Sequence, residues 1–302
     1  MIEGKVNGKG AMALDASAMG HSASLSRRTL WNYGATALIW GSAILTCLLL
    51  AFLMGYIFYR GIPYLSVDLL TSQSSYVRQT VGILPNLLNT LYIIIVAMVI
   101  VLPLGIGAAV YLTEYAANKK LVSMIEFATE TLTGIPSIIF GLAGMVLFIE
   151  MFGIKQGILA GGLTLVMMIL PVIIRTTQES LKTVPAAYRE GSLAMGSSKW
   201  HMIRTVVLPN AVDGIVTGCI LSVGRIVGES AALLFTAGFG LIINDFFTAL
   251  ESSSATLTVA LYVYASERGE TGVAFAIAVI LMSLTLLLNI AANLSAKKLK
   301  KS

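Results

Sequence analysis

Six long apolar runs, almost free of charged residues, alternate along the chain with shorter polar segments. A helix that crosses a membrane needs about 20 predominantly apolar residues, and each run supplies that length. The pattern predicts an all-α integral membrane protein with six transmembrane helices, over residues 30–59, 84–113, 129–151, 156–177, 211–236 and 271–296.

Polar segments flank this membrane domain (30–296) at both ends. Residues 1–29 are rich in Gly, Ser and Ala, which predicts a disordered tail, and residues 297–302 form a short basic tail. Arg27-Arg28 before an apolar run could indicate a twin-arginine signal. The uncharged run that follows is too long for the apolar region of a cleaved signal, so we expect an uncleaved first span.

Composition and charge support the membrane assignment. The chain is 57% apolar and only 12% charged, whereas a soluble domain is about 25% charged. The net charge of +5 could suggest nucleic-acid binding, but the basic residues lie between the apolar runs, which is a topology signal. With the N-terminus inside, 15 of the 20 basic residues fall on the cytoplasmic side, so both termini are predicted to be cytoplasmic.

One strongly polar stretch lies between the fourth and fifth runs. Pro185 suits the first position of a helix, and Gly196 suits the position just beyond its end. Ser197 or Ser198 can cap a second helix, which Pro209 is expected to stop. We predict a compact helix-turn-helix on the cytoplasmic membrane surface.

This stretch resembles the EAA loop of ABC-transporter permeases: Glu and two small residues, then Gly, then an aliphatic residue before Leu-Pro. Gly191 and Ser192 stand where the family often has Ala, and Val206 where Ile is common. In that family the loop docks onto the ATP-hydrolysing subunit; the alternative is an amphipathic interfacial helix without a partner. The coupling loop (185–209) contains Tyr188, Arg189, Glu190, Gly191, Ser192, Ala194, Gly196, Leu208 and Pro209.

Two charged residues lie deep in the fifth predicted span. Arg225 is about 14 residues, roughly 21 Å, into this helix, where a charged side chain costs at least about 2.5–3.5 kcal/mol. Glu229, four residues further on, is expected to share its helix face. Two interpretations remain open: a buried ion pair that fixes helix register, or a polar pathway in which Arg225 meets an anion.

The stretch around these two residues, GRIVGESAALLFTAG, resembles the corresponding helix of phosphate-uptake permeases of the PstA type. The similarity continues from about residue 80 onward. It implies a type I ABC importer permease bundle in a bacterial plasma (inner) membrane, with a substrate pathway at Arg225, Glu229 and Ser230. The implied partners are a PstC-type permease, two ATP-binding subunits, an external phosphate-binding protein and membrane lipid.

The segment TGIPSIIFGL in the third predicted span contains Gly134, Pro136 and Ser137. Small residues allow helices to approach closely, and Pro interrupts the backbone hydrogen bonds. The segment is either a flexible cavity wall or a helix-packing site.

The sequence argues against an enzyme. The nucleotide-binding motif GxxxxGK[ST] does not occur, and no catalytic or metal-ligand set is recognisable. We therefore expect no cofactor on this chain, with ATP and Mg bound by a partner subunit, and no nucleic-acid partner. Remaining alternatives are a permease for another oxyanion (sulfate, molybdate or phosphonate) and a membrane scaffold that signals phosphate.

Overall fold

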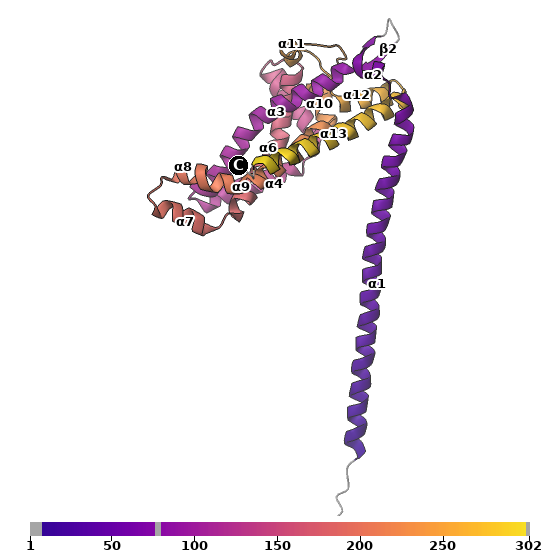
Figure 1. Cartoon of the computed structure of the whole chain (residues 1–302), viewed down its shortest axis with the longest axis vertical. Coiled ribbons are helices and arrows are strands. Elements are labelled where there is room, and N and C mark those ends of the chain that lie inside the picture. Colours follow the sequence, from indigo (N-terminus) through magenta and orange to yellow (C-terminus); the bar gives the residue numbers. More distant parts are fainter. Residues whose placement is uncertain (1–7, 76–79, 300–302) are drawn as a thin grey trace, which may run out of the picture. The chain divides into compact units, whose positions relative to one another are not determined.

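The computed structural model describes residues 8–75 and 80–299 (Figure 1). It divides into two compact units, Met1–Tyr56 and Ile57–Ser302, which are described separately. The first unit consists of most of α1 (Gly8–Gly61). Helix therefore begins at Gly8, within the tail predicted to be disordered, since this part lacks proline and is rich in alanine. Residues 1–7 lie outside the described residues.

Five described helices are long and apolar enough to cross a membrane, and a bent pair of helices supplies a sixth candidate. This agrees with the predicted all-α membrane fold and with the upper count of six. The five spans are Trp31–Tyr64, Leu84–Tyr115, Ile158–Thr183, Lys199–Gly228 and Thr271–Ala291.

The third predicted span is a broken helix. α4 (Lys119–Thr133) and α5 (Ser137–Gly144), which continues as the π-helix η3 (Met145–Met151), meet at 102°. Pro136 precedes the first turn of α5; it has no backbone N–H and disfavours helical geometry in the residue before it. A single straight span over 129–151 is therefore not formed.

The core of the second unit lies around α6 (Ile158–Thr183), the most buried of the candidate spans. α3 (Leu84–Val110) packs along one side of α6 and α9 (Leu208–Gly228) along another. Glycine permits the close approach between α9 and α6: a Cβ at Gly218 would lie 2.3 Å from Thr176 Oγ1.

The fifth predicted span is also interrupted. α9 ends at Gly228, and Glu229 is extended, with φ −83° and ψ 124°. The short α10 (Ala231–Thr236) begins two residues later. The prediction of one continuous helix over 211–236 is therefore wrong, because the backbone leaves helical geometry at Glu229.

Small elements gather at one end of the second unit (Figure 1). β1 (Gln73–Ser75) pairs antiparallel with β2 (Thr80–Ile83). The other elements are η1 (Ile62–Tyr64), α2 (Val67–Thr71), α11 (Phe246–Leu250), α12 (Leu257–Tyr262) and the π-helix η5 (Val263–Glu267), which precedes the last span, α13 (Thr271–Leu299).

Candidate functional site: the coupling loop and the interrupted α9–α10 span

The coupling loop forms the predicted helix-turn-helix at the opposite end of this unit (Figure 1). α7 (Ala186–Ala194) starts directly after Pro185, which is the N-cap rather than the first helical residue. Gly196 follows the helix with φ +83°, a conformation that favours glycine. The Ser197 hydroxyl closes the turn by donating to Ser192 O at 2.7 Å.

The second helix of the loop does not stop at Pro209. Ser198 caps α8 (Lys199–Met202) by accepting from His201 N at 3.3 Å. The chain then passes through the π-helix η4 (Ile203–Val207) into α9 and forms one span, Lys199–Gly228. Leu208 and Pro209 lie in the first turn of α9. The predicted stop is wrong because the wider π-turn before Pro209 tolerates its missing N–H.

The loop presents an open groove of 710 Å³. No residue of α7 is buried, and Met195 and Trp200 are 88% and 58% exposed. Such exposed apolar side chains around a groove are typical of an interaction surface. The groove is lined by Ala187, Tyr188, Gly191, Ser192, Met195, Gly196, Ser197, His201, Thr205 and Val206. Of the predicted residues, Glu190 and Ala194 are exposed outside this lining.

Arg189 has a different position from its neighbours in α7. Its Nε and Nη2 both donate to Glu114 Oε1, at 3.0 and 2.9 Å. Its Nη1 donates to Val184 O at 2.6 Å, and Nη2 also donates to Leu181 O at 2.8 Å. Glu114 belongs to the π-helix η2 (Tyr111–Tyr115), which continues α3. Arg189 therefore links α7 to the transmembrane bundle.

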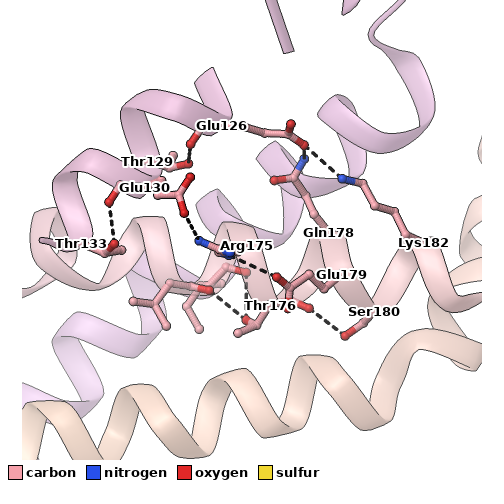
Figure 2. Close-up of polar contacts among 12 residues, drawn as sticks. Glu126, Thr129, Glu130, Thr133, Arg175, Thr176, Gln178, Glu179, Ser180 and Lys182 are labelled. Carbon is pink, nitrogen blue, oxygen red and sulfur yellow. Dashed lines mark hydrogen bonds and ion pairs between the residues drawn. The ribbon is translucent and has the colours of Figure 1, made fainter. Parts of the chain in front are cut away.

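A second polar cluster at this end joins α4 to α6 (Figure 2). Arg175 donates to Glu130 Oε1 at 3.2 Å and to Glu179 Oε1 at 3.1 Å. Glu126 Oε1 accepts from Lys182 Nζ at 3.1 Å and from Gln178 Nε2 at 3.3 Å. This cluster was not among the predicted residues, although Arg175 and Glu179 at i,i+4 spacing, opposite two acidic residues of α4, were a usable signal.

Arg225 and Glu229 do not form the ion pair of the first interpretation. Arg225 is half-buried in the last turn of α9, and no carboxylate of the described residues lies within 4.0 Å of its nitrogens. Glu229 is only 9% exposed, and its Oε1 accepts from Ala232 N at 3.1 Å. Each charge therefore lies at the helix end that favours it: the cation at the C-terminus of α9, the carboxylate at the N-terminus of α10.

A polar stripe lies along the first half of α9, before Arg225. The exposed positions of the helix follow its turns and include Asn210, Asp213 and Thr217 before Leu221 and Gly228. A helix face in contact with lipid tails is expected to be apolar. The stripe therefore suits a face that lines water or a partner chain. It was not predicted, because each of these residues taken singly is common at the end of a span.

The remaining predicted residues lie near these breaks. Gly134 and Pro136 form the α4–α5 bend, and half-buried Ser137 opens α5. Half-buried Ser230 precedes α10 and makes no side-chain capping hydrogen bond. α5 packs closely on α10, since a Cβ at Gly141 would lie 2.7 Å from the Ala232 Cα.

Residues 101–301 match the family model described as binding-protein-dependent transport system inner membrane component. The chain belongs to this family. It is 40% identical to a probable ABC transporter permease protein, YqgI, of Bacillus subtilis, over 68% of this chain and 69% of that protein. It is 32% identical to the phosphate transport system permease protein PstA of Haemophilus influenzae, over 79% and 85%, respectively. For PstA of Xylella fastidiosa the identity is 36%, over 59% and 62%.

Solved structures support the same fold. A bacterial alginate ABC transporter chain superposes with TM-score 0.67 at 14% identity, covering 89% of this chain and 96% of that chain. An inward-facing MetNI methionine ABC transporter chain gives 0.58 at 23% identity, covering 72% and 94%. Together with the family match and the apolar helices, this makes the chain a multi-pass inner-membrane protein with the fold of ABC importer permeases.

Proposed function

We propose that this chain is a permease subunit of an ATP-driven importer of inorganic phosphate. The named PstA relatives support the substrate. The observation that carries the proposal is Arg225: a half-buried guanidinium, not neutralised by Glu229, beside the break in a span.

Arg225 is suited to an anion that passes through the membrane. Its planar guanidinium can donate two parallel hydrogen bonds to a tetrahedral oxyanion. Helix ends near the middle of a span are a common way for transporters to build a substrate site. The Glu229 carboxylate is held by the α10 backbone. It therefore reduces but does not cancel the attraction of Arg225 for phosphate, so the site binds the anion weakly enough to release it.

The coupling loop supplies the link to ATP. In this proposal two cytoplasmic ATP-binding subunits bind ATP and Mg, and one of them occupies the groove along α7. A PstC-type permease forms the other half of the pathway against the polar stripe of α9, and an external binding protein delivers phosphate. ATP-driven movement of α7 then shifts the equilibrium between two arrangements of the helices.

The test is uptake of labelled phosphate by the complete transporter in vesicles, with unlabelled sulfate, molybdate or a phosphonate as competitors. Arg225→Gln is expected to abolish most uptake, whereas Arg225→Lys retains part of it because the charge remains but the planar fork is lost. Lys155→Gln is the matched control, since it removes an exposed cation paired with Glu251. Normal phosphate uptake by Arg225→Gln, or stronger competition by another oxyanion than by phosphate, would contradict the proposal. Phosphate-dependent signalling without uptake in the wild type would indicate a scaffold instead.

A further inference from the structure

Arg189 is the side chain of α7 that fastens this helix to the transmembrane bundle. It makes the four hydrogen bonds described above, to one carboxylate oxygen and two carbonyl oxygens. Every other side chain of α7 is exposed except half-buried Ser192, whose hydroxyl pairs with Ser197 inside the loop. The guanidinium thus makes the side-chain hydrogen bonds between α7 and the spans in the described structure.

The two ends of this contact belong to different spans. Leu181 and Val184 provide carbonyls at the end of α6, and the Leu181 carbonyl also accepts from Val184 N at 3.3 Å. Glu114 lies at the end of α3, on the π-helix η2. The Glu114 side chain is 7% exposed and that of Arg189 21%, so solvent screens their attraction weakly.

The order of the elements along the chain shows why the contact between α7 and α3 matters for coupling. α7 is joined covalently to α6 through Val184 and Pro185, and to α9 through the turn at Gly196. α3 has no such direct connection to α7, because α4, α5 and α6 lie between them in the sequence. Movement of α7 can therefore pull α6 and α9 through the backbone, but its direct polar contact with the α3 end is the Arg189–Glu114 pair.

We propose that Arg189 and Glu114 are positioning residues that make the end of α3 move together with α7. This inference rests on the proposed function, because it assumes that an ATP-binding partner drives α7. Arg189 does not contact ATP or phosphate in this role. It transmits the movement of α7 directly to the end of α3, which otherwise follows only through packing on neighbouring elements. Its two carbonyl contacts orient the guanidinium toward Glu114.

The first experiment compares coupling ratios in the complete transporter. Glu114→Gln keeps the volume of the side chain but removes its charge, and Arg189→Lys keeps the charge but cannot serve all three acceptors. Both are expected to raise the number of ATP molecules hydrolysed per phosphate imported roughly tenfold, since one buried charge then lacks its full set of partners. Glu126→Gln is the matched control: it removes the exposed pair with Lys182 at the same end of the bundle and is expected to leave the ratio unchanged.

The second experiment measures, in the absence of phosphate, whether α7 and the end of α3 move together. Spin labels at exposed Ala186 and exposed Tyr111 report the separation between α7 and the α3 end. In the wild-type complex this separation is expected to stay the same between the nucleotide-free and ATP-bound states. In Glu114→Gln it is expected to change or broaden on ATP binding, whereas Glu126→Gln behaves like the wild type.

The outcomes separate the two proposals. A wild-type complex that imports no phosphate contradicts the proposed function, and the label measurement still tests the linkage. A wild type that couples normally while Glu114→Gln shows the same ATP-to-phosphate ratio and label separation overturns the inference. Should Arg189→Lys fail to assemble, the isosteric Glu114→Gln decides.

Discussion

Two networks of ion pairs lie at the coupling-loop end of the bundle. They use the same types of side chain but differ in burial, and burial determines how strongly each one holds its helices together. The Arg189–Glu114 pair has side chains 21% and 7% exposed and joins α7 to the ends of α3 and α6. In the network between α4 and α6, every ion-paired side chain is at least 40% exposed (Figure 2).

The two networks should therefore differ in strength and in sensitivity to solvent. Exposed ion pairs contribute about 0–1 kcal/mol each and weaken in salt. Removal of one partner from a buried pair costs more, because the other charge remains without compensation. We interpret the inner pair as a permanent link and the α4–α6 network as weak surface contacts.

The largest expected effect comes from removing the inner cation. Arg189→Met leaves the buried Glu114 carboxylate without its cation and the Val184 carbonyl without its guanidinium donor, and should lower the free energy of unfolding by about 3–5 kcal/mol. Thermal unfolding of the purified complex measures this loss. Combining it with Glu114→Gln should recover part of the loss, because the unpaired charge is then gone; a fully additive double mutant would contradict direct pairing.

A neighbouring substitution should affect docking without affecting folding. Glu190 is exposed beside Arg189, so Glu190→Lys is expected to change the free energy of unfolding by no more than about 0.5 kcal/mol. Its reversed charge should nevertheless prevent ATPase coupling or assembly with the ATP-binding subunit. Pull-down of that subunit and phosphate-dependent ATP hydrolysis provide the measurements, and normal transport would contradict a docking role for this face.

The outer network should respond weakly to loss of its central cation. Arg175→Gln removes the contacts to Glu130 and Glu179 while Glu126 and Lys182 still pair. We expect a thermal midpoint close to that of the wild type but faster hydrogen exchange in α4. A loss of stability as large as that of Arg189→Met would mean that exposure does not separate the two networks.

The smallest expected effect is that of salt on the unmodified protein. Raising the ionic strength from 0.1 M to 1 M shortens the screening length from about 10 Å to about 3 Å. Amide exchange in α4 should accelerate, while exchange at the end of α6, which Arg189 caps, should change little. Equal acceleration at both sites would remove the distinction between them.

Several features of the fold were predictable because they follow from local composition. The apolar runs locate the spans, and the polar stretch with Pro185 and Gly196 locates the helix-turn-helix of the coupling loop. The bend at Gly134–Pro136 could also be anticipated from proline chemistry, although its angle of 102° could not.

The errors arose where a regular helix was assumed to continue or to stop. Pro209 was expected to end a helix that in fact continues through a π-turn. Glu229 was placed on the same helix face as Arg225, but the backbone departs from helix at that residue and the carboxylate binds the α10 backbone instead. A spacing of four residues brings two side chains together only while the helix is continuous.

The sequence by itself determined that this chain is a membrane-embedded helical protein with a polar helix-turn-helix loop, because apolar length and turn-forming residues act locally. Only the tertiary structure decided which charges meet. Arg189 and Glu114 are 75 residues apart in the chain, and their pairing depends on how α3, α6 and α7 pack. Electrostatic attraction depends on the distance between two charges and on their burial, and neither can be inferred from the spacing of the residues along the chain.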